Sequence, residues 1–412
     1  MHDGWELTTV GAASVNLDFR RIPVKKADRH WGPYPYYGAS GVVDQVDSYL
    51  FDGEHLLVAE DGENLNTRST PIAFIADGKF WVNNHAHILI GNERARTRFL
   101  LYALLEADVD GFITGSAQPK LSQGNLRQVP ILLPPVEVQD EIVRVLGLLD
   151  DKVLANGRLV SLIRQTIAAV FKATCVDYDV ALGNDIADLA ALRKQPSQDP
   201  ASLVESPLGP IPAGWDIATV SELADLQKVS VYPRQTPNLV FDHFSIPAFD
   251  DGEAPASELG VSILSGKYRV SSGAVLISKL NPHIPRVWLT NVRDPETAIC
   301  STEFMVIVPK RALDRPYLYA FFSSQEFFDR FGSLVTGTSN SHQRVKPQDL
   351  VAMQVVCPPA SVRDQLAALL EPLMRRITAA IEESHQLAAM RKGLMGPLLS
   401  GEITPEAVRI TP

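Results

Sequence analysis

A stretch of about seventeen residues occurs twice in this chain, and this repeat limits its possible folds more than any other feature. The two copies read "PILLPPVEVQDEIVRVL" (130–146) and "QVVCPPASVRDQLAALL" (354–370). They align without a gap, so Pro134 corresponds to Pro358 at an offset of 224 residues. Each runs from a short apolar segment through two prolines into an amphipathic helix. Repetition at this distance predicts a duplicated architecture.

Four further landmarks occur in both halves, in the same order. They are "GWELTTV" (4–10) with "GWDIATV" (214–220); "GEHLLVAEDG" (53–62) with "GAVLISKLNP" (273–282); "FWVNNHAHILI" (80–90) with "AICSTEFMVIV" (298–308); and the polar loops 114–126 with 336–350. The offset is 210 at the first pair, 220 at the second and 224 at the Pro-Pro stretch. Small loop insertions in the second copy explain this drift.

Each copy has two parts. The first, about 130 residues long, contains short strand-like runs between Gly, Pro and Asn, with some helix such as 96–107. This pattern predicts a compact mixed α/β module. The second part is a long amphipathic helix with apolar residues at steps of three and four, close to a heptad seam. The predicted seam residues are Ile142, Leu149, Val153 and Ile163 in the first copy and Leu366, Leu373, Ile377 and Leu387 in the second.

These seams are too apolar for a helix that stands alone in water. We expect them to pack against each other, and the alternative is that each helix packs onto its own module. Gly157 should cost the first helix about 1 kcal/mol relative to Ala. Pro372 should kink or split the second helix near Glu371, because proline removes a helical hydrogen bond.

The predicted organisation has six segments. The segment from 193 to 215 is rich in Pro and Ser and should be extended, and the C-terminal tail should have little structure. The predicted bounds are 1–135 for the first module, 136–175 for the first helix, 176–213 for the connector, 214–359 for the second module, 360–396 for the second helix and 397–412 for the tail.

Composition restricts the class of protein. The 412 residues suggest two or three domains. We find no uncharged apolar run of about 18 residues and no secretory pattern at the N-terminus, so neither a membrane span nor export is expected. Cys175, Cys300 and Cys357 lie far apart in the sequence, which favours a reducing cytoplasm over a disulfide framework.

Charge does not decide the partner by itself. The net charge of −10 argues mildly against a polyanionic partner, but local charge matters more. Basic residues cluster at 20–30 and at 93–99. Each cluster is either a binding surface or a solvated face.

Several patterns typical of catalytic sites are present only in part. "NPHI" (281–284) resembles a methyltransferase motif but differs at its third and fourth positions, and no Gly-rich cofactor loop precedes it. His85 and His87 alternate on a predicted strand, so both should face one way. They could begin a metal site, but no third ligand is evident, and we predict no metal. Gly78-Lys79 lacks the context of a phosphate loop. Glu60-Asp61 favours a turn over a nuclease site.

The order of several short stretches resembles a known family over nearly the whole chain. These stretches are "SPLGPIPAGW", "YPYYGASGVV", "NNHAHIL", "STEFMVI" and the doubled Pro-Pro entry into the long helices. Each is weak alone, but their duplicated order is specific. The chain resembles the specificity (S) subunit of type I restriction–modification systems.

The resemblance implies a fold and a function. The fold would be mixed α/β, with two target recognition domains in a pseudo-twofold repeat, separated by two long antiparallel coiled-coil-like helices. Each domain would read one half of a bipartite double-stranded DNA target. The chain would be cytoplasmic and non-catalytic, with no cofactor of its own. It would dock two methyltransferase subunits carrying S-adenosylmethionine, and restriction subunits using ATP and Mg would join them.

Elementary geometry agrees with this role. Two DNA-reading modules must lie about one DNA turn apart, roughly 34 Å. A helix of about 35 residues spans roughly 50 Å. A rigid helix pair therefore fixes the spacing between half-sites in a way that a flexible linker does not.

Candidate DNA contacts follow from chemistry. Lys and Arg bind phosphates or guanine, and Asn and Gln suit adenine. The loops 115–120 and 337–346 occupy matching places in both copies, which favours them over scattered basic residues. The candidates are Lys25, Lys26, Tyr36, Tyr37, Ser40, Arg68, Gln118 and Lys120 in the first module, and Lys279, Asn281, Arg286, Ser339, Asn340, His342, Arg344 and Lys346 in the second.

Two alternatives from other classes stay open. One is a stand-alone DNA-modifying enzyme, a nuclease or methyltransferase with a diverged site. The other is a protein-binding adaptor with two similar modules and no affinity for DNA. A salt-dependent shift of duplex DNA separates the adaptor from a DNA-binding subunit, because phosphate contacts make affinity fall steeply with salt.

Overall fold

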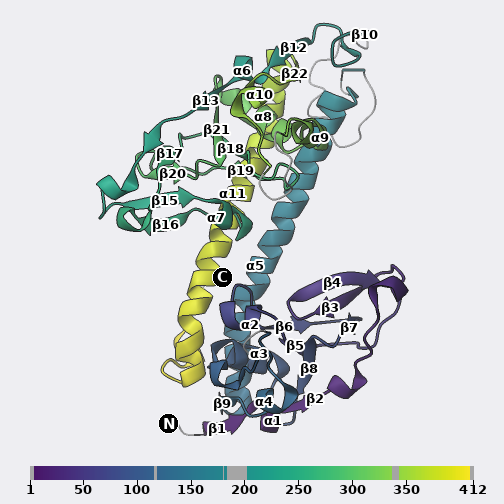
Figure 1. Ribbon diagram of the computed structural model, residues 1–412, viewed down its shortest axis with the longest axis vertical. Coiled ribbons are helices and arrows are strands. Elements are labelled where there is room, and N and C mark those ends of the chain that lie inside the picture. Colours follow the sequence, from purple (N-terminus) through teal and green to yellow (C-terminus); the bar gives the residue numbers. More distant parts are fainter. Residues whose placement is uncertain (1–3, 116–117, 180, 183–201, 336–342, 409–412) are drawn as a thin grey trace. The chain divides into compact units, whose positions relative to one another are not determined.

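The computed structural model describes residues 4–115, 118–179, 181–182, 202–335 and 343–408. The chain forms two compact units. Unit one comprises Met1–Lys152 and Leu387–Pro412, and unit two comprises Val153–Gln386. Two long helices, α5 (Val136–Phe171) and α11 (Ala360–Ser400), each contribute residues to both units. Figure 1 shows each of them as one continuous helix.

Unit one is built around a four-stranded antiparallel sheet in the order β2-β8-β5-β6. Its strands alternate their side chains between two cores, as a pleated strand buried on both faces must. Leu56 and Val58 of β5 pack in the core that includes helix α3, whereas Leu57 packs on the opposite face with Phe51 and Phe80. The bounds are β2 (Ser14–Asn16), β5 (His55–Ala59), β6 (Ala73–Ala76), β8 (Ala86–Gly91) and α3 (Thr97–Glu106).

Smaller elements complete unit one. A three-stranded sheet, β4-β3-β7, holds β3 and β7 in parallel, and β1 pairs with β9 antiparallel. The remaining bounds are β1 (Glu6–Thr9), α1 (Val10–Ala13), β3 (Tyr34–Gly38), β4 (Gly41–Val46), α2 (Asn64–Thr67), β7 (Trp81–Val82), α4 (Gln123–Leu126) and β9 (Pro130–Leu133), with short 3-10 turns at Asp18–Arg20, Lys26–Asp28 and Asp110–Phe112.

Unit two repeats this topology. Its four-stranded sheet has the order β13-β21-β18-β19, and β12 pairs with β22 as β1 does with β9. A parallel pair, β15 with β20, matches β3 with β7, and β14 and β17 extend that sheet to five strands. The strand bounds are β12 (Asp216–Thr219), β13 (Ala224–Gln227), β14 (Ser230–Val231), β15 (Val240–Phe244), β16 (Ala256–Leu259), β17 (Lys267–Arg269), β18 (Val275–Ser278), β19 (Val287–Leu289), β20 (Ala298–Cys300), β21 (Phe304–Pro309) and β22 (Gln354–Cys357).

The helices within the second module are short. They are α6 (Val220–Leu223), α7 (Ile246–Asp250), α8 (Arg315–Phe322), α9 (Gln325–Ser333) and α10 (Pro347–Val351); a two-stranded pair, β10 (Leu203–Val204) with β11 (Ile211–Pro212), precedes them, and 3-10 turns lie at Pro233–Gln235, Gly260–Ser262 and Ala312–Asp314. The predicted fold class, mixed α/β with a duplicated module and two long helices, is confirmed.

One detail of the predicted repeat is wrong by a single residue. The sequence aligned 53–62 with 273–282 at an offset of 220, but strand pairing matches Leu56 of β5 with Val275 of β18, an offset of 219. The offset of 218 between β8 and β21 agrees with these pairings and with the faces of the strands, since Leu89 and Ile307 both face the cores that include the long helices. A slip of one residue moves every side chain to the other face of the sheet. With the corrected register, Leu56 and Val275 both face the cores that include the long helices.

The apolar seams of the long helices are buried inside both units. In unit one, Ile142, Val145 and Leu146 of α5 share a core with Met395 and Leu398 of α11. A second core, in unit two, contains both helices as well as the module; its helix residues are Val160, Ile163, Ile167, Val170, Phe171, Leu366, Leu370, Met374, Ile377 and Ala380. Each module is therefore packed by both helices, which neither of the two predicted arrangements described.

The helices run antiparallel within unit two. Asn156 of α5 donates from Nδ2 to the Ala380 carbonyl oxygen (3.3 Å) and to Glu383 Oε2 (2.8 Å) of α11. Fifteen residues later in α5, Phe171 contacts the ring of Tyr317, whose hydroxyl bonds to Val356 just before α11 begins. Later positions in α5 thus lie near earlier positions in α11. The other predicted seam residues Leu149, Val153, Leu373 and Leu387 are buried or half-buried.

Two expectations about the helix ends and breaks are corrected. α11 is continuous through Pro372, so proline does not split it. The tail is ordered through residue 408: a 3-10 turn forms at Pro405–Ala407, Pro405 is buried, and Ile403 and Val408 pack on the core of unit one. At the end of α5, Lys172–Val176 forms a π-helical turn. The expected connector lies largely outside the described residues, which resume at 202.

Among the described residues, one stretch, Val136–Val176, is long and apolar enough to cross a membrane by length and composition alone. Core helices of soluble proteins meet the same criterion. Its buried side chains include Ile142 and Val145 in the core of unit one, and Val160 and Ile163 in the core of unit two. Packing within the units accounts for this apolar character.

Two neighbouring residues of α5 test the packing. Ile163 is 6% exposed in the core of unit two, whereas Leu162 is 60% exposed. We expect Ile163→Ala to destabilise unit two by about 2–4 kcal/mol, because it removes buried methyl groups and leaves a cavity. Leu162→Ala is the matched control and should change stability by less than about 0.5 kcal/mol. Hydrogen exchange of unit-two peptides measures both effects, and equal exchange in the two variants would contradict the assigned burial.

Candidate functional site

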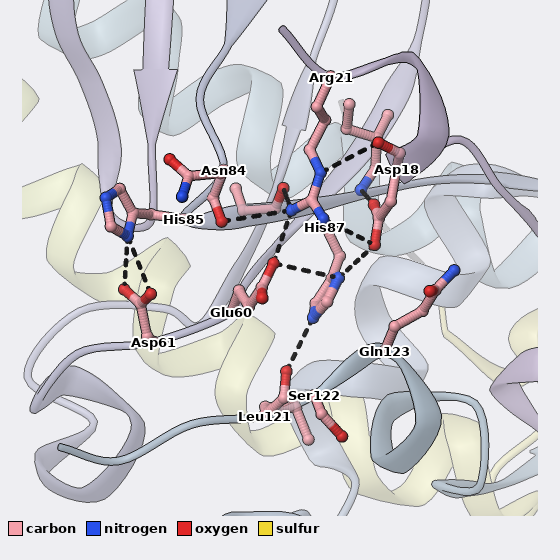
Figure 2. A network of polar contacts seen from close by, with 12 residues as sticks. Asp18, Arg21, Glu60, Asp61, Asn84, His85, His87, Leu121, Ser122 and Gln123 are labelled. Atoms are coloured by element: carbon pink, nitrogen blue, oxygen red, sulfur yellow. Dashed lines mark hydrogen bonds and ion pairs between the residues drawn. The ribbon is translucent and has the colours of Figure 1, made fainter. Parts of the chain in front are cut away.

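The polar groups of unit one gather at one end of its four-stranded sheet. Strand β5 ends at Ala59 and its antiparallel neighbour β8 begins at Ala86, so the residues just beyond them are adjacent. The Glu60 N–H donates to the His85 carbonyl oxygen, and the Leu121 N–H donates to the Glu60 carbonyl oxygen, each at 2.8 Å. We call this place the polar end of unit one; Figure 2 shows its side chains Asp18, Arg21, Glu60, Asp61, His85 and His87. Lys120, which pairs with Glu60, also belongs to it.

The buried part of the polar end is an ion pair. His87 is fully buried on β8, with Nδ1 2.5 Å from Asp18 Oδ2 and Nε2 2.8 Å from the Leu121 carbonyl oxygen. A carbonyl oxygen only accepts hydrogen bonds, so Nε2 carries a hydrogen. Burial raises the pKa of Asp18, but the hydrogen bond and charge of His87 and the N–H of Ile88 outweigh it, and the net pKa is lowered. Asp18 is therefore a carboxylate, and His87 donates from both ring nitrogens.

Glu60 joins two basic segments of the sequence. Its Oε2 lies 2.6 Å from Nη1 of Arg21, and its Oε1 lies 3.1 Å from Nζ of Lys120. Burial opposes ionisation of Glu60, but hydrogen bonds from Arg21 and Lys120 lower its pKa overall. Arg21 also donates to the Ala86 carbonyl oxygen at 3.0 Å. The basic segment 20–30 and the loop 114–126 are thus held to the same carboxylate.

His85 lies on the outside of this network, and the prediction that it faces the same way as His87 is wrong. His85 belongs to the turn before β8, where the alternation of a strand does not apply. Its Nδ1 is 2.9 Å from each carboxylate oxygen of Asp61, and its side chain is 47% exposed. Within the described residues, no group of three or more His, Cys, Asp or Glu side chains is placed to hold a metal ion.

Unit two presents the same backbone frame with different side chains. Lys279 takes the place of Glu60: its N–H donates to the Glu303 carbonyl oxygen (3.0 Å), and its carbonyl oxygen accepts from Val345 (3.1 Å). Glu303 takes the place of His85, and Arg344 that of Lys120. Nε and Nη2 of Arg344 each lie 3.1 Å from a carboxylate oxygen of Glu303.

The predicted contact residues of unit one fall into two groups. Lys25, Lys26, Ser40, Arg68, Gln118 and Lys120 are exposed. The two tyrosines instead pack inside the unit. Tyr36 is fully buried, with its hydroxyl on Val24 and the Arg29 guanidinium 4.2 Å from its ring centroid, and half-buried Tyr37 packs on Phe74 and Phe80. Arg68 is paired with Asp110 at 2.7 Å.

The candidates of unit two are also divided. Arg344 and Lys346 are exposed, whereas Lys279 is half-buried. Arg286 is 8% exposed and binds both carboxylate oxygens of Asp250, so its planar fork is already occupied. Asn281 adopts a positive φ of 49°. Ser339, Asn340 and His342 lie outside the described residues.

Asp18 and Glu60 are the residues of the polar end that the sequence did not single out. Asp18 lies in no repeated landmark, and Glu60-Asp61 was assigned to a turn. The alignment of the two repeats supplies the missing signal for Glu60, because only the corrected offset of 219 makes Glu60 the counterpart of Lys279. Proximity to Lys120 then follows from the bridge between Asp61 and Lys120.

Comparisons with known proteins agree on one family. A family model described as the type I restriction modification DNA specificity domain matches residues 14–162. A Haemophilus influenzae protein named as a type I restriction enzyme specificity subunit is 42% identical over 130 residues, which are 31% of this chain and 33% of that protein. The EcoDI specificity subunit of Escherichia coli is 21% identical over 428 aligned positions, covering 98% of this chain and 89% of the relative.

A solved structure shows the same fold. The crystal structure of a type I restriction–modification S subunit from M. genitalium aligns with a TM-score of 0.60 and 12% identity, over 96% of each chain. At this identity the likeness concerns the fold. It extends over both modules and both long helices.

The buried ion pair predicts a specific pH dependence. Asp18→Asn should destabilise unit one by about 3 kcal/mol at neutral pH, because it removes the counter-charge of a buried cation. The folded-state pKa of Asp18 lies below the ordinary 3.8. Its stabilisation is therefore complete above about pH 3.8 and is lost as the pH falls through the lowered pKa.

Urea unfolding of both proteins from pH 7 to pH 3 measures this effect. The difference in unfolding free energy should be large at neutral pH and should shrink as the pH falls below about 4. Exposed Asp28, in the same segment, provides the control Asp28→Asn, which should have little effect. A destabilisation by Asp18→Asn no larger than that by Asp28→Asn would contradict the ionised pair.

Proposed function

This chain belongs to the family of specificity subunits of type I restriction–modification systems, and from that premise we propose that each of its units reads one half of a bipartite DNA target. One observation carries the proposal. The two units share a strand order and a backbone frame at their polar ends, yet differ in the side chains there. A repeated frame with different polar groups suits a protein that reads two different half-sites.

The exposed cations supply affinity for the DNA backbone. Lys25, Lys26, Lys120 and Lys346 are exposed on their units, although the chain as a whole carries a net charge of −10. Contacts with phosphates position a protein on the duplex, and contacts with base edges specify the sequence. Because each phosphate contact releases counterions, affinity for DNA should fall steeply with salt.

The long helices are proposed to set the spacing between the half-sites. α5 has 36 residues and α11 has 41, which correspond to lengths of about 54 Å and 62 Å. Each helix is uninterrupted and contributes to the cores of both units. A helix buried at both ends gives a fixed length where a flexible linker would give a distribution.

We further propose that the chemistry belongs to partners. The chain would dock two methyltransferase subunits, which bring S-adenosylmethionine, because a duplicated module offers two similar surfaces to identical partners. Restriction subunits using ATP and Mg would join that complex. The chain itself would be non-catalytic and, like the DNA that it binds, cytoplasmic.

Methylome sequencing tests the proposal. The chain is expressed with an adenine methyltransferase subunit of its own system in a host that lacks other methylation. We expect methylated adenines within a motif of two short specific parts separated by a fixed spacer. Methylation by the purified chain without a partner would establish the stand-alone enzyme instead. A complex that binds all duplex sequences equally would also overturn the proposal.

The spacer itself should respond to helix length. Removing seven residues, about two turns or roughly 10 Å, from the middle of each long helix keeps the apolar seam in phase. We expect the methylated motif to keep both half-sites and to change the number of base pairs between them. An unchanged spacer in a folded variant would contradict the role of the helices.

A module exchange serves as the control for this experiment. Replacing residues 4–125 with the corresponding module of another family member should change one half-site and leave the spacer unaltered. The spacer and the half-site would then vary independently, as expected if the helices determine the one and the modules the other. A change of both half-sites after this exchange would argue against one module per half-site.

A further inference from the structure

We propose that His85 reads a base edge in the half-site of unit one through its Nε2, while Asp61 fixes the proton on the opposite ring nitrogen. The proposal rests on the DNA-reading function proposed above and assigns a specificity-determining residue to it. His85 was grouped with His87 by sequence, but the structure separates the two histidines completely.

The first argument is pre-organisation of an exposed group. The His85 N–H donates to Asn83 Oδ1 at 2.8 Å, and its carbonyl oxygen accepts from the Glu60 N–H at 2.8 Å, so its backbone is held on both sides. Its ring is held by Asp61, and Figure 2 shows the ring turned toward Asp61 and away from the buried ion pair. Within the described residues, Nε2 has no protein partner. A polar group with a fixed orientation and a free end is what recognition requires.

The second argument concerns which atoms Nε2 can recognise. A carboxylate only accepts hydrogen bonds, so the hydrogen of the neutral ring resides on Nδ1, which faces Asp61. Nε2 then presents a lone pair to the outside. In the major groove, lone pairs are complementary to the amino groups of adenine N6 and cytosine N4, and they oppose guanine O6 and thymine O4. The tautomer fixed by Asp61 therefore favours adenine or cytosine at one position.

The third argument is the position of His85 beside a phosphate-binding candidate. Asp61 forms a backbone bridge with Lys120, and the Lys120 side chain is 51% exposed. Lys120 lies in the polar loop that sequence analysis indicated as a DNA contact. A cation for phosphate and an acceptor for a base edge are thus held on adjacent backbone segments.

The fourth argument comes from unit two. The position of His85 is taken by Glu303, a partly exposed polar side chain whose two carboxylate oxygens accept from the basic residue Arg344. By contrast, the position of His87 is taken by Met305, which is 2% exposed in the core. The repeat therefore conserves burial at the position of His87 and a partly exposed polar side chain at that of His85. Only the second position is available to DNA.

The experiment uses the complex of this chain with its methyltransferase subunits. Duplexes carry every base at each position of the half-site read by unit one, and binding is measured at several salt concentrations. We expect His85→Ala to reduce discrimination at one position by roughly tenfold to 100-fold, with the preferred base being adenine or cytosine in the parent complex. The other half-site and the salt dependence should not change.

Two further variants sharpen the test. Asp61→Asn keeps the ring but lets an amide donate to Nδ1, so it should relax the same position by a smaller factor. Glu303→Ala, the counterpart in unit two, should relax one position in the other half-site only. Thermal unfolding of each variant checks that the complex stays folded. We expect it to stay folded, because the Glu60 N–H bonds to the main-chain carbonyl oxygen of His85, and the Leu121 N–H to that of Glu60. Neither bond involves the His85 side chain.

The possible outcomes distinguish failure of the His85 inference from failure of the proposed DNA-reading function. Uniform weakening for all sequences with a smaller salt slope would identify a phosphate contact and overturn base reading. Unchanged discrimination in His85→Ala, or a guanine preference at the affected position, would overturn the assigned acceptor. Failure of the proposed function is recognised differently, because the parent complex would then show no bipartite specificity at all.

Discussion

Burial of apolar side chains from both long helices holds each unit together, and the geometry of the polar ends depends on it. In each unit the two helices lie in one core with the central strands: Val275 and Ile277 share the core of unit two with Ile163 and Ile377. A buried aliphatic side chain of this kind contributes about 1.5–3 kcal/mol relative to leaving it exposed. Because β5 and β18 are buried on both faces, their ends are fixed in position. The polar loops are held to those strand ends by main-chain hydrogen bonds from Leu121 and Val345, so they are fixed in position as well.

On this rigid frame the two units use different electrostatics at one position. Unit one buries the His87–Asp18 pair, whereas unit two places Met305 against the core. A buried ion pair is seldom more stable than an apolar pair of similar size, because removing two charges from water is costly. The pair therefore contributes orientation more than stability: His87 holds the Leu121 carbonyl oxygen, which directly follows Lys120. Any movement that separated His87 from Asp18 would leave a buried charge without a partner, which costs free energy. This cost holds His87, and with it the loop at Leu121, in a single position.

The sequence predicted the duplicated plan because burial imposes a pattern on it. The apolar runs at β5, β8, β18 and β21 and the seams of α5 and α11 all appear in the structure. The sequence alignment of β5 with its counterpart β18 was wrong by one residue. Both strands are continuous apolar runs, which lack the alternation of polar and apolar residues that would fix such an alignment. Arg286 and Tyr36 were selected by residue type, and burial depends on tertiary contacts that residue type does not reveal. Pro372 does not divide α11, since Leu370 and Met374 on either side of it are anchored in the core.

The placement of recognition residues beyond the ends of the strands separates specificity from stability. The Glu60 N–H and carbonyl oxygen hold the loops through main-chain bonds, and these bonds do not depend on the side chain at position 85. An exposed side chain at such a position can therefore change at a cost within about 0.5 kcal/mol. Comparison of His85 with Glu303 shows two different side chains on equivalent backbone. By contrast, Ile163 and Ile377 cannot change without loosening a core that contains both long helices. Under the proposed function, a chain built in this way can acquire a new half-site through exposed substitutions, while the helices proposed to set the spacing remain constrained by packing.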